Sequence, residues 1–350
     1  MPSLLKYAGT TIPWLPLVFS PLVHAHHGSL ANSALYDSDE LIVLEGEITE
    51  VLWRNPHARA HLSVVDENGE ETVWEIETQP GPVEFGRMGI SEEDLIGHAR
   101  VAGFRSKRNP DSLGVLNLLL PSGREYHANN REPQWSDTGV RIVPQEPDPD
   151  RAAAERETAN GIFRMWSRRL GPRPQAESYA HLLTGRGREL AAEFDPPRDN
   201  PELACRSGVA ATMFDPNPME VVDEGDRITL ILEEYDIRRT IHLGENAEPG
   251  SQEHTPLGFS AGRWEGNTLV VTTTHLDWPY LDPYGTPQSQ QVEYLERFEL
   301  SDDHTELSYS LTATDPIMFT APITLEHQRR WAPGIEIPPF NCAAGWEDQE

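Results

Sequence analysis

The sequence predicts a mainly β protein with two barrels: an OB-like small barrel, then an antiparallel lipocalin-like barrel, joined by a short helical connector. Two regions contain short β runs punctuated by turn residues, and a Pro-rich stretch with helical patterns separates them. The predicted boundaries are a signal peptide at 1–25, the OB-like domain at 26–134, the linker and helical connector at 135–204, and the second barrel at 205–345.

The N-terminal segment has the pattern of a secretory signal peptide. Its first 25 residues carry one charge, Lys6, followed by an apolar stretch at 7–23 and the small-x-small ending Val23-His24-Ala25. Prolines interrupt the stretch, and no later run reaches the roughly 18 apolar residues of a spanning helix. We therefore expect cleavage after Ala25, a periplasmic or secreted protein, and no transmembrane anchor.

Cleavage after Ala25 would leave His26 as the first residue and His27 as the second. An α-amine has a pKa near 8, so a metal can displace its proton, and the amine can chelate together with the imidazole of the same residue. Nitrogen ligands in a flat arrangement favour Cu(II) over Ni(II) or Zn(II). The sequence therefore predicts a copper site at the processed N-terminus.

His57, in Trp53-Arg54-Asn55-Pro56-His57, is the expected third ligand of that site. Pro56 marks a strand edge or bulge that can aim a side chain outward. His61 is a poorer ligand, because four residues of strand would separate it from His57 by about 13 Å. The predicted metal ligands are thus His26, His27 and His57, and the alternative is that these histidines bind no metal.

The OB-like domain is predicted from its strand pattern. Asn68-Gly69 favours a hairpin between the second and third runs, and Ser91 begins a short helix or helical turn at 91–95. The expected strands are 41–51, 61–65, 72–77, 99–104 and 115–120.

The connector and the second barrel follow from a change of pattern. Helices are expected at 150–159, 161–170 and 181–194, before the β alternation returns. Cys205 and Cys342 bracket the second barrel, and in an oxidising compartment they predict one disulfide rather than two free thiols. The expected strands are 227–235, 239–243, 268–274, 291–300, 306–314 and 320–330.

The second barrel also carries candidates for ligand binding and catalysis. Glu234 or His242 would act as a base beside Arg239, while Tyr235, Trp264 and Phe298 would line a pocket for a small apolar ligand. Such a site would suit an isomerase, hydratase or lyase. The alternative is structural: Arg239, Glu296 and Arg297 form ion pairs, and Trp264 closes the barrel end.

Charge and absent motifs exclude several classes of function. The chain of 350 residues has 28 Lys+Arg against 57 Asp+Glu, a net charge of −29. This charge repels phosphate backbones, so nucleic acid is not an expected partner. The sequence has no Gly-rich phosphate loop, Gly-x-Ser-x-Gly, His-Glu-x-x-His or Cys-x-x-Cys motif, which argues against nucleotide-binding, serine-hydrolase, zincin and thioredoxin activities.

Three stretches resemble two known families. His26-His27-Gly28-Ser29 and Trp53-Arg54-Asn55-Pro56-His57 resemble an uncharacterised exported bacterial domain family, and the Gly-Arg-Trp-Glu-Gly-Asn-Thr-Leu-Val-Val stretch at 262–271 is similar to a second uncharacterised exported family. The resemblance implies export and architecture but no activity. From the residues we expect an exported binding protein that coordinates copper; the alternatives are the lipocalin-like enzyme and a structural envelope protein.

Overall fold

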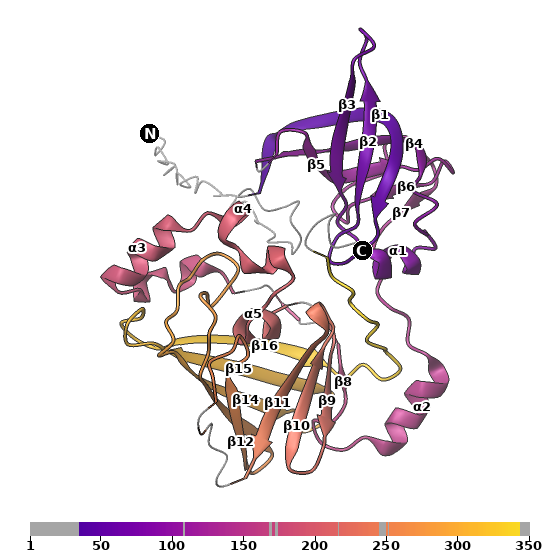
Figure 1. Ribbon diagram of the computed structural model, residues 1–350. Coiled ribbons are helices and arrows are strands. Elements are labelled where there is room, and N and C mark those ends of the chain that lie inside the picture. Colours follow the sequence, from indigo (N-terminus) through magenta and orange to yellow (C-terminus); the bar gives the residue numbers. More distant parts are fainter. Residues whose placement is uncertain are drawn as a thin grey trace, which may run out of the picture.

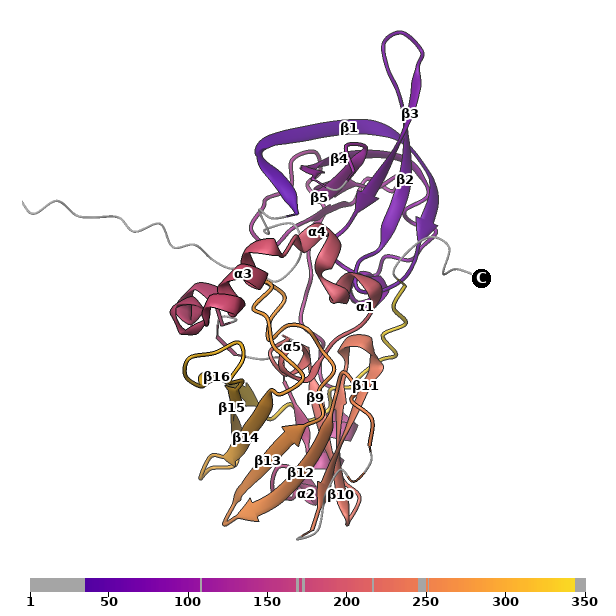
Figure 2. The same ribbon diagram turned by 60° about the vertical axis from the view of Figure 1, so that its left-hand side comes forward.

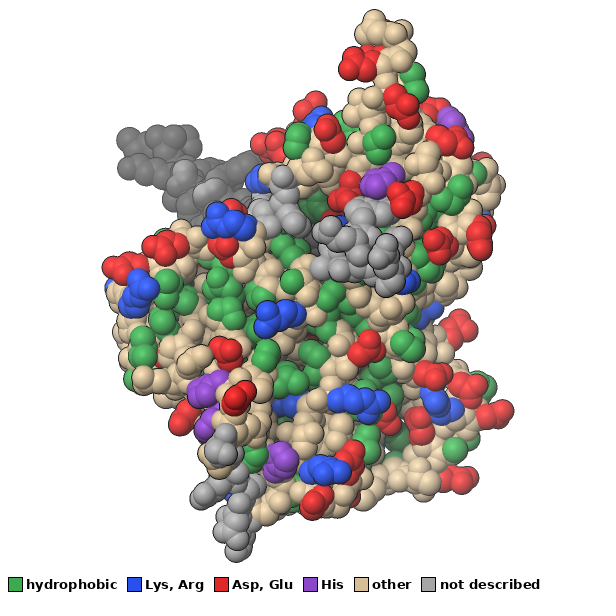
Figure 3. Space-filling model, viewed as in Figure 1, with side chains coloured by type: hydrophobic (Ala, Val, Ile, Leu, Met, Phe, Trp, Pro, Cys, Tyr) green, Lys and Arg blue, Asp and Glu red, His purple; other side chains and the backbone are tan. Residues whose placement is uncertain are grey.

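A computed structural model describes residues 35–107, 109–167, 170–171, 174–215, 217–244, 250 and 252–343 (Figure 1). Within this part the protein is mainly β, with one sheet in the N-terminal region and one in the C-terminal region. Figure 3 shows acidic side chains spread over both regions on one face of the molecule. No helix in the described part is long and apolar enough to cross a membrane.

The N-terminal sheet contains the five predicted strands and two short additions. β1 pairs with β2 and β4, β2 pairs with β3, and β4 pairs with β5. A parallel pairing of β3 with β5 joins the two ends of this order of five strands. The strands are β1 Tyr36–Leu52, β2 Arg59–Val65, β3 Glu71–Glu77, β4 Gly97–Ser106, β5 Ser112–Leu119, β6 Glu125–His127 and β7 Gly139–Val140.

The local turns of this sheet follow their sequence signals. The predicted hairpin is confirmed: Gly69 adopts φ 83°, and the β2–β3 hairpin projects from the sheet in Figure 2. Residues 91–95 form a turn, in which the amide of Ser91 donates to Asp94 Oδ2 at 2.8 Å. Helix α1, Pro82–Arg87, was not predicted; Pro82 suits a first helical turn, and Phe85 is buried.

The connector is only partly helical. The helix expected at 150–159 is confirmed as α2, Pro149–Thr158, whose N-terminus is capped by Asp148. The helix expected at 181–194 forms as η3, Ala180–Leu182, and α3, Gly185–Glu193. Shorter helical elements complete the region: η2 Ala176–Ser178, α4 Pro196–Asp199, η4 Pro201–Ala204 and α5 Val209–Met213.

The helix expected at 161–170 is wrong, because this segment closes the second sheet. β8, Met165–Trp166, pairs with β9, Met219–Asp223. The amide of Leu170 donates to the carbonyl of Gln328 on β16, Ile323–Arg330, at 2.8 Å. The carbonyl of Met165 likewise accepts from Ala332 at 3.0 Å. Hydrogen bonding to two sheet edges satisfies the backbone better here than a helix would.

The C-terminal sheet has the order β16-β15-β14-β13-β12-β11-β10-β9-β8. Hydrogen bonds of Met165, Ser167 and Leu170 with residues 328–332 connect its two ends, so the sheet makes a nearly closed barrel. Antiparallel pairing was expected throughout, but β11 and β12 run parallel. The strands are β9 Met219–Asp223, β10 Arg227–Leu232, β11 Ile237–Leu243, β12 Phe259–Glu265, β13 Thr268–Thr274, β14 Glu293–Leu300, β15 Glu306–Thr314 and β16 Ile323–Arg330.

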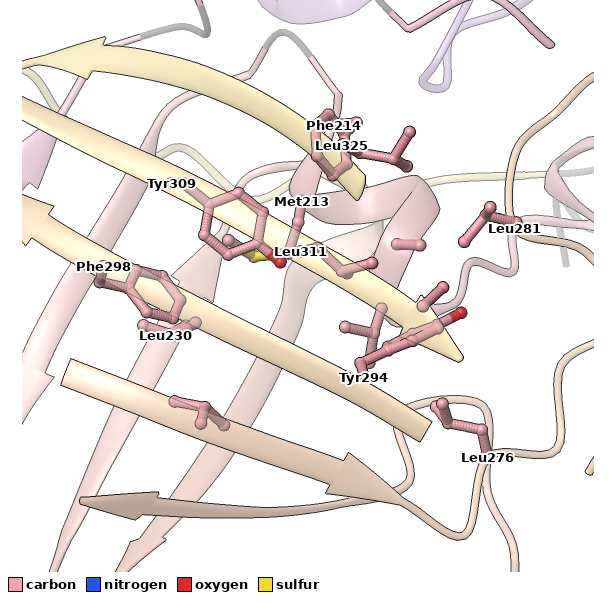
Figure 4. Close-up of a cluster of buried hydrophobic side chains, with 14 of the residues drawn as sticks. Met213, Phe214, Leu230, Leu276, Leu281, Tyr294, Phe298, Tyr309, Leu311 and Leu325 are labelled. Carbon is pink, nitrogen blue, oxygen red and sulfur yellow. The ribbon is translucent and has the colours of Figure 1, made fainter. Parts of the chain in front are cut away.

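The barrel interior is filled by side chains of the protein itself. Every residue of α5 is buried, and Figure 4 shows Met213 and Phe214 among side chains from β14, β15 and β16. His327 Nε2 lies 2.8 Å from the carbonyl of Met213, and Arg329 donates to the same carbonyl. His327 and Arg329 thus satisfy the carbonyl group of Met213 at the end of α5. This contact gives the two polar side chains a hydrogen-bond partner inside the barrel.

Candidate functional site

His57 lies in the segment between β1 and β2 and is half-buried. Its Nδ1 lies 2.6 Å from the carbonyl oxygen of Gln79. A carbonyl only accepts, so in the neutral ring Nδ1 carries the proton and Nε2 keeps its lone pair. Metal-binding histidines commonly have this arrangement, with one ring nitrogen bonded to a backbone carbonyl and the other bonded to the metal.

The backbone on both sides of this contact is fixed by hydrogen bonds. The amide of Ala58 donates to Pro80 at 3.1 Å, and the amide of Thr78 donates to Ala58 at 2.9 Å. The hydroxyl of Thr78, only 2% exposed, lies 2.8 Å from each of the carbonyls of Ala58 and Pro80. These hydrogen bonds hold the backbone beside His57 in place.

Asn55 connects this segment to the C-terminal strap, which we define as residues 338–343. Asn55 is 4% exposed; its side-chain amide donates to the carbonyl of Phe340 and its backbone amide to Asn341 at 3.3 Å. The amide of Ala343 returns a bond to Asn55 at 3.2 Å. In Figure 1 the chain leaves β16 and runs to the N-terminal domain along this strap.

The strap is also attached to the second barrel. Asp236 accepts from the amides of Phe340 at 2.9 Å and Asn341 at 3.3 Å. The predicted disulfide is confirmed: Cys205 and Cys342 are bonded, with their Cα atoms 5.9 Å apart. Asn55 of the N-terminal domain therefore bonds to the strap, and so do Asp236 and Cys205 of the C-terminal region. The strap joins the two domains beside His57.

The other predicted metal ligands, His26 and His27, lie outside the described residues. Within the described residues no group of three or more His, Cys, Asp or Glu side chains could hold a metal ion. His61 Nδ1 lies 3.0 Å from Glu50 Oε2 on the strand beside it.

Arg239, predicted as a catalytic residue, is 2% exposed and forms an ion pair with Glu296, which is fully buried. Arg239 Nη1 lies 2.8 Å from Glu296 Oε1, and Nη2 lies 2.7 Å from Thr273 Oγ1 and 2.9 Å from Ser260 Oγ. Tyr309 donates to Glu296 Oε1 at 2.6 Å. The Arg239–Glu296 contact is the ion pair that the structural alternative expected.

Electrostatics keep this pair charged despite its burial. Burial alone would raise the pKa of Glu296, but the charge of Arg239 and hydrogen bonds from Arg239, Tyr309 and Thr273 outweigh it, so the pKa lies below its ordinary value. Burial raises the pKa of Tyr309 well above its ordinary value, and the Glu296 charge adds to this effect. Tyr309 is therefore a hydrogen-bond donor to the carboxylate.

Of the other predicted catalytic residues, His242 shares a pocket with Arg239, whereas Glu234 lies elsewhere. The strand expected at 227–235 ends at Leu232, and Glu234 falls in η5, Glu234–Asp236, where its Oε2 accepts from Asn217 at 3.2 Å. His242 stacks on Phe259, with ring centroids 4.9 Å apart and 10° between the planes. His242 and Arg239 both line a pocket of about 260 Å³ beside β11 and β12, but Glu234 does not.

The predicted aromatic lining is also dispersed. Tyr235 lies in η5 with φ 57°, and its ring centroid is 5.3 Å from that of Phe340 in the strap. Phe298 is fully buried against Tyr309. Trp264, by contrast, is 42% exposed and lines a separate surface pocket. The structure does not bring these three side chains into one cavity.

The sequence analysis also missed the buried acidic residue Glu125. Glu125 on β6 is fully buried and accepts from Asn117 Nδ2 at 2.7 Å. It also accepts from the amides of Gln134 at 2.8 Å, Trp135 at 2.7 Å and Ser136 at 3.0 Å. Backbone amides, rather than a basic side chain, donate to the carboxylate of Glu125, so no basic residue in the sequence signals the contact. Through these bonds Glu125 fixes the loop that leaves the N-terminal domain.

Comparison with known proteins gives a family likeness for the N-terminal region. A family model described as Family of unknown function (DUF6152) matches residues 18–115. The matched residues include His26, His27 and His57, together with β1 to β4 and half of β5. The match does not reach residues 262–271, where the second resemblance stays an expectation. No curated protein matches the chain.

Proposed function

We propose that the protein is an exported binding protein that coordinates copper at its processed N-terminus. The α-amine and imidazole of His26 form the chelate, and His27 or His57 supplies a further nitrogen. The amine enters the site only if cleavage follows Ala25. A family model matches residues 18–115, a range that includes all three histidines, and this supports the proposal that they belong to one site.

The contact between His57 and Gln79 is the observation that carries this proposal. Nδ1 is engaged 2.6 Å from the Gln79 carbonyl, so Nε2 is the nitrogen that can bind a metal. The other ligands of the proposed site, His26 and His27, lie outside the described residues. A terminal amine and two neighbouring imidazoles are donors of the kind that copper prefers.

The protein residues around His57 would orient and restrain this ligand. Thr78 and Pro80 fix the backbone beside it, and Asn55 is bonded to the strap on the other side. Such outer contacts typically change metal affinity by about 10–100-fold when removed. Bound copper would supply a centre for electron transfer or for binding a further ligand.

The same proposal extends to compartment and architecture. A disulfide between Cys205 and Cys342 suits an oxidising compartment, which supports a periplasmic or secreted location. We propose an OB-like barrel for β1 to β5, because the pairing of β5 with β3 joins the two ends of their order and α1 lies between β3 and β4 in the chain. For the second barrel we propose a lipocalin-like relationship, supported by its mainly antiparallel order.

The enzymatic alternative has less support. A lipocalin-like isomerase, hydratase or lyase needs an open interior for its apolar ligand, whereas Arg239 is bonded to Glu296 and Phe298 packs against Tyr309. The structural alternative, an envelope protein without a ligand, is favoured by the strap and its disulfide. A copper titration separates it from the main proposal.

The test is a calorimetric titration of the exported, processed protein with Cu(II). We expect one copper ion per chain, and we expect His57→Ala to weaken binding at least about tenfold because one arm of the chelate is lost. His61→Ala is the matched control, since His61 is paired with Glu50 on the same strand pair. If His57→Ala and His61→Ala bind copper equally, His57 is not a ligand; if the processed protein binds none, the proposal fails.

A further inference from the structure

The exposed Trp264 stands in a pocket at the end of the second barrel. The pocket has a volume of about 570 Å³ and is formed by the β12–β13 turn, the β14–β15 turn and residues 160–163. Figures 1 and 2 show the β12–β13 turn at the end of the barrel remote from the N-terminal domain. Barrel mouths are common ligand sites, and about 300–1,000 Å³ is their usual size.

The floor of the pocket is aromatic. Trp264 is 42% exposed, although large aromatic side chains normally bury most of their surface. Phe163 supports it edge-on, with ring centroids 6.1 Å apart and 71° between the planes. Phe163 thus steadies the indole, whose exposed surface faces solvent and can be covered by the apolar face of a ligand.

The rim of the pocket is polar but carries little charge. Among the described residues that line it, Asp302 and His304 are the ionisable side chains, and none is a lysine or an arginine. Three polar side chains of the rim make no hydrogen bond within the described part of the chain: the side-chain amides of Asn160 and Asn267 and the carboxylate of Asp302. These groups are therefore available to a ligand that enters the pocket.

This chemistry selects among ligand classes. A phosphate or carboxylate ligand would find no lysine or arginine among the lining residues and would meet Asp302. A quaternary ammonium would suit the indole, but it would leave the two amide groups desolvated without partners, which is costly. A neutral ring with one apolar face and several hydroxyl groups can cover the indole of Trp264 with that face. Its hydroxyl groups can form hydrogen bonds with the side chains of Asn160, Asn267 and Asp302.

We propose that the Trp264 pocket binds a neutral carbohydrate, with one pyranose ring stacked on the indole and its hydroxyl groups bonded by Asn160, Asn267 and Asp302. The site is distant in the sequence from the copper ligands and does not depend on copper. It gives the second barrel a binding role at its mouth rather than in its filled interior.

The test measures binding of defined small molecules to the full processed chain by saturation-transfer NMR, followed by calorimetry. The probes are methyl glycosides of neutral hexoses and their disaccharides, with choline as the cationic probe and cyclohexanol as the apolar probe. We expect a neutral sugar to bind and the two other probes not to bind.

Substitutions then locate the site. Trp264→Ala should weaken sugar binding at least about tenfold, which corresponds to about 1.4 kcal/mol. Trp264→Phe, which keeps a flat ring, should retain more affinity, and Asp302→Ala should weaken binding without loss of fold. Tyr284→Ala is the matched control, because Tyr284 is a 39% exposed aromatic residue outside the pocket. No sugar binding, preferential binding of choline or cyclohexanol, or equal affinities of Trp264→Ala and Tyr284→Ala would each overturn the proposal.

Discussion

Arg239 on β11 and Glu296 on β14 meet inside the C-terminal barrel, with Nη1 of the arginine 2.8 Å from Oε1 of the glutamate. Two strands lie between them in the sheet order, and each contributes a hydroxyl group to the pair: Ser260 from β12 and Thr273 from β13. The network therefore ties four consecutive strands together through side chains.

Removing one partner of this pair should destabilise the protein strongly. Arg239→Met leaves the Glu296 carboxylate buried without its cation, and we expect the free energy of unfolding to fall by about 3–5 kcal/mol. Urea unfolding followed by circular dichroism measures the loss. Arg297→Met is the control, because Arg297 pairs with Glu265 at the surface and should leave the unfolding midpoint nearly unchanged. Equal midpoints for the two variants would argue against a stabilising network.

The same pair makes stability depend on pH. The pKa of folded Glu296 lies below the ordinary value of 4.5, which it regains on unfolding. Its contribution is thus present above about pH 4.5 and is lost as the pH falls through the lower, folded value. Urea midpoints at a series of pH values should fall more steeply below pH 4.5 in the wild type than in Glu296→Gln. Parallel pH profiles would show that Glu296 titrates normally when folded.

The disulfide should stabilise the second barrel and hold the strap. Its sequence separation is 137, for which the chain-entropy model gives at most about 5 kcal/mol. We expect a double Cys205→Ser, Cys342→Ser variant to unfold at lower urea concentration and to be cleaved by protease within residues 338–343. Reduction of the wild type should reproduce both effects. A strap that resists protease in the double variant would mean that Asn55 and Asp236 suffice to hold it.

Asn55 should control the mobility of the strap from the N-terminal domain. Asn55→Ala removes the side-chain bond to Phe340 and should cost about 1 kcal/mol, since the backbone bonds of Asn55 remain. Hydrogen exchange of residues 338–343 should become faster, while exchange in β14 and β15 stays unchanged. Asn68→Ala, in the exposed β2–β3 hairpin, serves as the comparison. Unaltered exchange in the strap would contradict a joining role for Asn55.

Strand positions were predictable where alternation and turns agreed. The strands at 268–274 and 306–314 match β13 and β15 in full. The first is a run of Leu, Val and Thr, the second alternates polar and apolar residues, and turn residues precede both. The segment at 161–170 failed because its apolar spacing suits a helix, whereas its hydrogen bonds go to β9 and β16. Local sequence does not specify partners that are more than fifty residues away.

The candidate sites were predictable to a smaller degree. Cys205 and Cys342 were paired correctly because the chain has only two cysteines. The strand residues Arg239 and Glu296 were placed in an ion pair as one of two alternatives, and the structure has that pair. The roles of Asn55 and Asp236 could not be predicted, because their partners are backbone groups of the strap, which leave no complementary residue type in the sequence.

The affinity of the processed N-terminus for Cu(II) tests the central claim most directly. Two forms of the protein that begin at His26 are compared by calorimetric titration: one with a free α-amine, and one whose α-amine is acetylated. The account predicts that the first form binds one copper ion and that the second binds it about a hundredfold more weakly or worse, because the acetylated nitrogen cannot take part in the chelate. Equal affinities of the two forms would contradict it.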